Sequence, residues 1–314
     1  MVLAPVRRLA MIGIVFLAAA CNATGSGSRN DVEAAYWYRQ AAQEGVPAAM
    51  ADYANLLAEG RGVAKDEAEA VAWFRKAADN DSAYAMAYLG VMYFHGRGVA
   101  PNDSEAVRLF RQSADKGHYL GQRNLGVCYE HGKGVPKDEA EAFRLYRLAA
   151  DQGDLTSQYY VGVFLDKGRG VTKDEAQAVE WFSKAADKGY ALAQTYLGYM
   201  YENGNGTRQS WREAAKWYRR AAEKGETVGQ MNLANFLAEG KGVEKNEAEA
   251  VQWLRMAANK NDPRAFTDLA RMLMDGRGTE RNVEEARVLL LKAAGQGYAR
   301  AKLILGRMSD TARG

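Results

Sequence analysis

The chain has 314 residues, of which 47% are hydrophobic and 26% are charged, so it can bury a large core and lacks the composition of a disordered chain. Its formal net charge of +3 at pH 7 is small for this length and excludes the concentrated basic excess of a dedicated nucleic-acid-binding protein. Only five prolines occur, which favours a helical protein.

Residues 1–20 have the pattern of a secretory signal peptide. Arg7 and Arg8 precede the apolar run LAMIGIVFLAAA, which is too short to persist as a membrane-spanning helix. The end of this run, LAAAC, resembles a bacterial lipobox, in which a peptidase cuts before a cysteine that becomes lipidated. Ala18 stands where a lipobox usually has leucine, so ordinary cleavage after residues 18–20 is the alternative. We expect cleavage before Cys21, lipidation of Cys21 and a flexible tether over residues 21–29.

The lipobox resemblance also implies a location in the cell envelope. Asn22, not aspartate, follows Cys21, so the resemblance implies a protein anchored in the outer membrane and facing the periplasm. After modification of Cys21 only the Cys128 thiol remains, so we expect no disulfide within the chain.

A Gly-x-Gly sequence recurs along the chain at a constant spacing of 36 residues. A single glycine-rich loop before a helix suggests phosphate binding, whereas a copy at every step predicts a structural turn. We expect the middle residue of each turn, such as Arg97, to project into solvent. The first glycines of these seven turns are Gly60, Gly96, Gly132, Gly168, Gly204, Gly240 and Gly276.

Each turn is followed by the pattern of a helix start. A residue that can cap a helix through its side-chain oxygen is followed, three positions later, by Glu or Gln, which resembles a capping box. Capping therefore accounts for these acids without a catalytic role. The expected caps are Asn30, Asp66, Asn102, Asp138, Asp174, Ser210, Asn246 and Asn282.

This first helix carries an apolar stripe and ends at a residue type suited to a left-handed conformation. The stripe contains an alanine column and a second column that we expect in the core: Trp37, Trp73, Leu109, Leu145, Trp181, Trp217, Trp253 and Leu289. The expected left-handed ends are Gly45, Asp81, Gly117, Gly153, Gly189, Gly225, Asn261 and Gly297. A second helix follows, in which small residues beside a leucine column allow close packing.

The unit is therefore a 36-residue helix–turn–helix that repeats eight times over residues 30–314, with the last copy truncated. Residues 168–201, GRGVTKDEAQAVEWFSKAADKGYALAQTYLGYMY, make the unit similar to the Sel-one-like repeat (SLR) family, a relative of tetratricopeptide repeats. The resemblance implies an all-α, right-handed superhelical solenoid whose concave face binds other proteins, with no catalytic residue and no cofactor.

Enzymatic alternatives have little support in the sequence. His95 and His131 share a column just before the glycine turn and would be candidate metal ligands if they converged. The same column holds lysine and acids in other repeats, which is typical of solvated positions, so we predict no metal site. Cys128 occupies a column of methionines and phenylalanines and is expected in the core. Some SLR proteins with paired cysteines bind or hydrolyse β-lactams, but this chain lacks the pairs.

Two surfaces are candidates for partner binding. The first is an outward-facing arginine strip on the first helices, which would suit an acidic partner unless acids four residues later, such as Asp79, Asp115 and Asp151, neutralise it. The strip comprises Arg75, Arg108, Arg111, Arg144 and Arg147. The second is a tyrosine column on the second helices, which either anchors a partner or fills the join between repeats. Its members are Tyr88, Tyr160 and Tyr196. We place Tyr93, Tyr129 and Tyr201 in a core column and exclude them.

These features predict a non-catalytic, lipid-anchored scaffold or adaptor of the bacterial cell envelope that binds another protein. An immunity protein that neutralises a secreted toxic effector, such as a phospholipase, is the alternative. An enzyme acting on β-lactams or the cell wall is a more distant one. An effector gene beside the coding gene would distinguish immunity from scaffolding.

Overall fold

The structure is a computed structural model that describes residues 29–311, and the secondary structure of these residues is entirely α-helical. The predicted signal peptide, Cys21 and nearly all of the predicted tether lie outside the described residues. The first helices of the repeats are α2 (Arg29–Gln43), α4 (Glu67–Asp79), α6 (Asp103–Asp115), α8 (Glu139–Asp151), α10 (Glu175–Asp187), α12 (Trp211–Glu223), α14 (Glu247–Ala258) and α16 (Val283–Gly295). The second helices are α3 (Pro47–Glu59), α5 (Ala83–His95), α7 (Tyr119–His131), α9 (Leu155–Lys167), α11 (Ala191–Asn203), α13 (Thr227–Glu239), α15 (Pro263–Asp275) and α17 (Ala299–Thr311).

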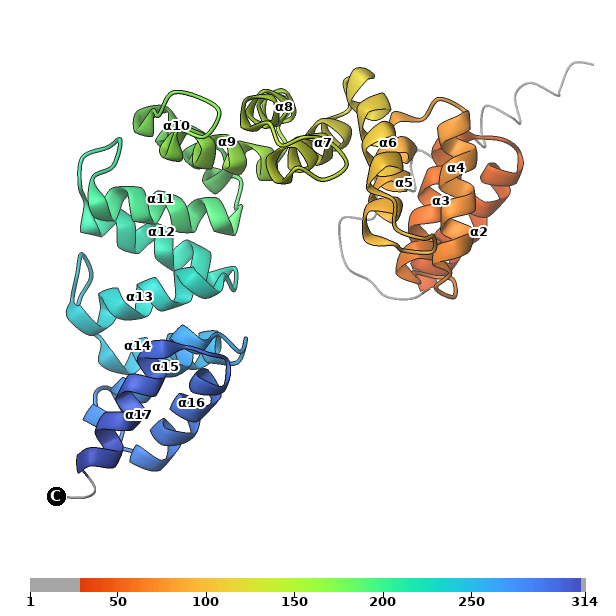
Figure 1. Ribbon diagram of the computed structural model, residues 1–314. Helices are drawn as coiled ribbons and strands as arrows, with labels where there is room; N and C mark the ends of the chain where they lie inside the picture. The colour runs from red at the N-terminus through yellow and green to blue at the C-terminus, as the bar shows by residue number, and fades with distance from the viewer. Residues whose placement is uncertain (1–28, 312–314) are drawn as a thin grey trace, which may run out of the picture. The chain divides into compact units, whose positions relative to one another are not determined.

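Helices that follow each other in sequence pack against each other in space. The helices form two compact units, α2–α8 and α9–α17, and within each unit every helix contacts the helices before and after it (Figure 1). Stacking of helical hairpins on their nearest neighbours is the organisation of a solenoid. The predicted all-α solenoid of eight repeats is therefore confirmed.

The predicted helix caps form in seven of the eight repeats. The Asp66 side chain, for example, accepts a hydrogen bond from the Glu69 amide at 2.8 Å, and the equivalent bond occurs at every cap through Asn282. Such caps each contribute about 1 kcal/mol to helix stability. The prediction for Asn30 is wrong, because α2 begins at Arg29 and Asn30 lies within its first turn.

The reciprocal half of the capping box does not form. The Asp66 amide instead donates to the Leu57 carbonyl at 2.9 Å, at the end of the preceding helix, and the same bond recurs at the other six caps. The Glu or Gln three residues after the cap bonds the cap's side chain in three repeats: Gln177 donates to Asp174 at 2.6 Å, and Glu249 and Glu285 accept from Asn246 and Asn282 at 3.4 and 3.3 Å. In other repeats it accepts from an arginine, as Glu105 and Glu141 do.

The first helices end as predicted, in a left-handed backbone conformation. Asp81 and Asn261 have φ values of 69° and 63°, and the other six positions are glycines with φ between 78° and 93°. The second glycine of the Gly-x-Gly turn is required for a further reason. A Cβ atom on Gly98 would collide with the Glu67 carbonyl group, in the first turn of the preceding first helix.

The middle residue of the turn does more than project into solvent, so that prediction is wrong for Arg97. The Arg97 guanidinium donates to the Glu67 carboxylate at 2.9 Å and to the Ala58 carbonyl oxygen, at the end of α3, at 3.2 Å. Arg277 makes the same two contacts, with Glu247 at 2.9 Å and with Ala238 at 3.0 Å. Arg97 thus joins the turn after α5 to α3 and α4, and Arg277 joins the turn after α15 to α13 and α14.

The core lies one residue further along the first helix than predicted. Trp37, expected in the core, is 46% exposed, and Trp73, Trp253 and Leu289 are half-buried, although Leu109, Leu145, Trp181 and Trp217 are buried as expected. The following column is deeply buried in every repeat: Tyr38, Phe74, Phe110, Tyr146, Phe182, Tyr218, Leu254 and Leu290.

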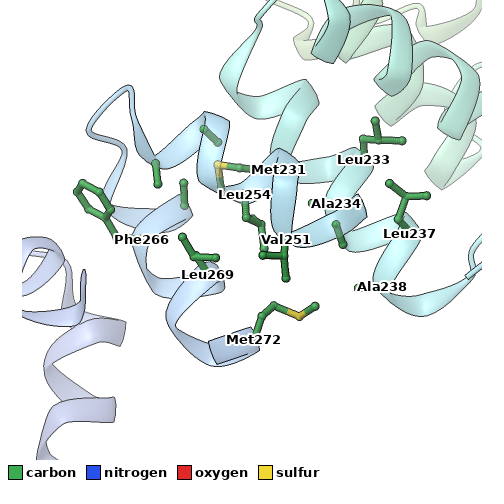
Figure 2. Packing of buried hydrophobic residues seen from close by; sticks show 14 of the residues in the cluster. Met231, Leu233, Ala234, Leu237, Ala238, Val251, Leu254, Phe266, Leu269 and Met272 are labelled. Carbon is green, nitrogen blue, oxygen red and sulfur yellow. The ribbon is translucent and has the colours of Figure 1, made fainter. Parts of the chain in front are cut away.

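Small residues on the second helices accommodate these side chains. A Cβ on Gly90 would lie 2.6 Å from the Phe110 ring, so glycine lets the ring approach the helix backbone. Where the first helix carries leucine, as at Leu254, the second helix carries the larger Ala234. Figure 2 shows this packing, in which Val251 and Leu254 of α14 lie between α13 and α15.

Candidate partner-binding surfaces

The predicted arginine strip is exposed, and its charges are largely paired. Arg108 donates to both oxygens of Glu105 at 2.6 and 2.8 Å, and Arg144 donates to both oxygens of Glu141 at 2.7 Å. Bidentate bonds of this kind are the strong form of the arginine–carboxylate contact. The strip therefore carries much less net positive charge than its arginine count suggests.

Only one of the predicted i,i+4 ion pairs occurs in the strip, between Arg147 and Asp151 at 3.2 Å. Arg75 and Arg111 do not pair with Asp79 and Asp115. They donate instead to the hydroxyls of Tyr93 and Tyr129, at 2.9 and 3.2 Å, on the second helix that follows each of them.

These contacts also correct the placement of Tyr93 and Tyr129. Both are half-buried, and their hydroxyls reach the surface and hold arginines. In the second unit, Arg219 and Arg255 connect neighbouring first helices by bonding to Glu249 and Glu285. Arginines of this column thus link successive elements of the stack.

The predicted tyrosine column is half-buried among other aromatic rings. Tyr88 stacks on Phe74 with ring centroids 5.6 Å apart and lies 4.6 Å from Tyr84. Tyr196 lies 5.3 Å from Tyr159 and 5.4 Å from Phe182. Tyr160 also contacts Tyr159, at 5.4 Å. These contacts correspond to the alternative in which the tyrosines fill the join between repeats.

The structure shows a polar hollow that the sequence did not predict. It has a volume of about 260 Å³ and lies on the second helices α11, α13, α15 and α17, with one residue from a turn. Its lining residues are Glu202, Asn232, Asn235, Phe236, Glu239, Lys241, Asp268, Arg271 and Arg300.

The hollow presents amides and charges of both signs. Asn232 and Asn235 of α13 face Asp268 and Arg271 of α15, one repeat later, and each pair is separated by three residues, which places it on one helix face. Burial raises the pKa of the Asp268 carboxyl, and the nearby guanidinium groups of Arg300 and Arg271 oppose that rise. The nearest atoms of Arg300 and Asp268 are 3.7 Å apart.

The sequence analysis did not identify this hollow. Asn232 and Asp268 share a column with Tyr88, Tyr160 and Tyr196, and their polarity was used only to infer that the tyrosines reach solvent. A usable signal was present. Both outward columns of α13 and of α15 are polar, whereas the corresponding positions of α11 are Tyr196 and Tyr199. Amide side chains both donate and accept hydrogen bonds and thus complement peptide groups.

The residues considered for catalysis are dispersed. His95 and His131 are exposed at the ends of α5 and α7. Cys128 is fully buried, and burial raises the pKa of its thiol to about 12, so it is protonated and unreactive at neutral pH. Within residues 29–311 no three His, Cys, Asp or Glu side chains are grouped so that they could hold a metal ion. None of the helices in the described part of the chain has the length and apolar character needed to span a membrane.

The fold defines a class, the helical-hairpin solenoids. The Sel1 repeat model matches eight segments, which are 13–46, 47–82, 83–118, 120–154, 155–190, 191–226, 227–262 and 265–298. The chain belongs to the Sel1 repeat family. Each matched unit from residue 47 onward begins at a second helix, so the family frame differs from the frame used above by one helix. No curated protein matches the chain.

Solved structures show the same fold. One is a protective antigen of uropathogenic Escherichia coli strains with an SLR fold, which is 32% identical with a TM-score of 0.74 over 96% of this chain. The chain spans only 64% of that protein's length. A Sel1 repeat protein from Oxalobacter formigenes is 30% identical with a TM-score of 0.68, over 79% of this chain and 96% of that one. Yeast Tom70, at 13% identity and a TM-score of 0.50 over 91% of this chain and 62% of its own, shares the fold alone.

Sel1 repeat proteins act as protein-binding scaffolds and are typically non-catalytic.

Proposed function

We propose that this chain is a lipid-anchored scaffold or adaptor of the bacterial cell envelope that holds a partner protein in the polar hollow of α11–α17. The observation that supports this proposal most directly is the convergence of two amides, three acids and three cations from α11, α13, α15 and α17 and from the turn after α13. The arginine strip and the tyrosine column fit less well, because their members are engaged in contacts within the solenoid. In the hollow, Glu202 bonds Tyr218 and Lys241 pairs with Glu239, but Asn235 and Arg271 make no hydrogen bond or ion pair with the described residues.

The chemistry of the hollow indicates the kind of segment it binds. Asn232 and Asn235 complement the backbone of an extended peptide, and Arg271 and Arg300 suit an acidic side chain of the partner. A partner carboxylate would compete with Asp268 for Arg300, whose separation of 3.7 Å from Asp268 is longer than a hydrogen bond.

Site-specific photo-crosslinking tests the surface. A crosslinker at Asn235 is expected to capture the partner in envelope extracts, whereas one at the exposed Gln252, on a first helix of the same unit, is not. The double variant Asn235→Ala/Arg271→Ala is expected to lose capture by a crosslinker placed elsewhere in the hollow, at Glu239. Retained capture by this variant, together with loss on reversing the charges of Arg108, Arg111, Arg144 and Arg147, would move the interface to the arginine strip.

The anchor has its own test. Cys21→Ser is expected to abolish acylation and to release the protein from the membrane fraction, and unchanged membrane retention would contradict the anchor. Separation of the inner and outer membranes, followed by detection of the wild-type protein in each fraction, checks the predicted location in the outer membrane.

A further inference from the structure

The first described helix exposes a group of large apolar side chains. Val32, Tyr36 and Trp37 of α2 are 55%, 56% and 46% exposed. The rings of Tyr36 and Trp37 meet edge to face with centroids 5.0 Å apart, so they form one continuous patch. We call these three residues the α2 patch.

Large apolar residues at these positions are special to α2. The columns of Val32 and Tyr36 hold alanine, serine, glutamine or charged residues in the other first helices, with Val288 of α16 as the exception. The equivalents are Ala68 and Ala72, Ser104 and Arg108, Ala140 and Arg144, Ala176 and Glu180, Arg212 and Lys216, Ala248 and Gln252, and Glu284 and Val288.

The repeat architecture leaves these two columns open. Every equivalent residue is exposed, although each of those first helices has a second helix packed before it. A second helix packed before α2 in the same manner would therefore leave Val32 and Tyr36 exposed. Something outside the solenoid is needed to cover the patch.

The length of the chain between Cys21 and α2 indicates which surface covers the α2 patch. From Cys21 to Arg29 the backbone can extend over at most roughly 28 Å. This step rests on the proposed lipidation of Cys21, which would keep α2 within that distance of the bilayer. Tyrosine and tryptophan favour the boundary between lipid and water, where the ring is buried and the polar atom stays hydrated. We propose that the α2 patch lies against the lipid surface to which Cys21 is attached.

Fluorescence quenching by brominated lipid tests this contact. The chain from residue 21 onward is placed on vesicles of phosphatidylethanolamine and phosphatidylglycerol that contain brominated phosphatidylcholine. We expect part of the tryptophan emission to be quenched, Trp37→Phe to remove the quenched component, and Trp211→Phe to retain it. Trp211 is the matched control because it is 48% exposed, on α12 of the other unit.

The anchor is supplied chemically so that the two proposals can fail separately. A maleimide phospholipid coupled to the Cys21 thiol replaces natural acylation, and Cys128 does not compete because it is fully buried. Loss of natural acylation with quenching intact would contradict only the lipoprotein assignment.

Three results would overturn the patch proposal. Two of them are quenching that persists in Trp37→Phe and quenching that is absent from the lipid-coupled wild type. The third is a dimer of the uncoupled chain, seen by sedimentation, that dissociates in Tyr36→Ser/Trp37→Ser, because a second copy would then be the occupant.

Discussion

At the scale of the residue, Asp268 lies half-buried on α15, close to Arg271 and Arg300. Its ionised carboxylate suits a binding surface but lowers the stability of the fold. Burial raises the pKa of its carboxyl in the folded state. The folded chain therefore holds this proton more tightly than the unfolded chain does, so ionisation of Asp268 lowers the free energy of unfolding as the pH rises through the folded pKa. The cost is absent below the unfolded pKa, at about pH 3.9.

We expect Asp268→Asn to unfold at a higher urea concentration than the wild type at pH 7, with the difference vanishing towards about pH 4. Urea titrations followed by circular dichroism at both pH values measure this. Asp275→Asn, which changes an exposed aspartate at the end of the same helix, is the control. A variant that is less stable than the wild type at pH 7 would show that the attraction to Arg300 outweighs the burial of the charge.

At the scale of the element, two glycines with similar backbone conformations have different roles. Gly98 has φ 65° and its missing Cβ leaves room for the backbone of Glu67 at the start of α4. Gly117 has φ 78° and no atom lies within 4 Å of where its Cβ would be. The first glycine serves both conformation and packing, and the second serves conformation alone.

Alanine substitutions separate these two requirements. Gly117→Ala is expected to destabilise the chain by about 1–2 kcal/mol, the cost of a left-handed conformation for a residue with a Cβ. Gly98→Ala is expected to cost clearly more, because the backbone of the turn has to move away from the start of α4. Urea unfolding of both variants measures the difference, and equal losses would show that the contact with Glu67 relaxes freely.

Local signals were readable from the sequence, and contacts between repeats were not. The caps at Asp66 and Asn102 and the left-handed end at Asp81 follow from the chemistry of single side chains, so spacing alone predicted them. The deeper position of Phe74 relative to Trp73 depends on how closely α3 and α5 approach α4, because adjacent columns on one stripe are both apolar.

The candidate site also depends on contacts between repeats, which the sequence of one repeat does not reveal. The hollow arises where polar residues of four separate second helices converge, and no single repeat contains it. The arginine strip was read correctly as exposed, but its bonds to Tyr93 and Glu105 depend on the rotamers of the packed structure.

At the scale of the whole molecule, each of the two units has hydrophobic core of its own. In α2–α8 one cluster runs from Ala35 to Leu109 and another surrounds Cys128. In α9–α17 a large cluster runs from Ala214 to Ala301. Repeats in a solenoid depend chiefly on their neighbours, so each unit contains most of the contacts that stabilise it.

Expression of residues 29–154 and 155–311 as separate fragments is therefore expected to give two folded helical proteins. Their circular dichroism spectra, added together, should reproduce the spectrum of the combined region, and each should unfold cooperatively in urea. A fragment with the spectrum of a random coil would show that folding of that unit requires the other.

The arginines in the Gly-x-Gly turns have a consequence for how such a chain can change in length. Arg97 and Arg277 reach back to two earlier helices, so one residue inserted in that turn would displace both bonds at once. The bend at Gly117 has no neighbour within 4 Å of the position of a Cβ, but the residues on either side of it contact the preceding repeat, where Lys116 pairs with Asp81 at 2.6 Å and the His118 ring lies 5.9 Å from the Tyr84 ring. A change in length by one whole 36-residue module would keep these bonds in register, whereas a shorter insertion in a Gly-x-Gly turn would break them.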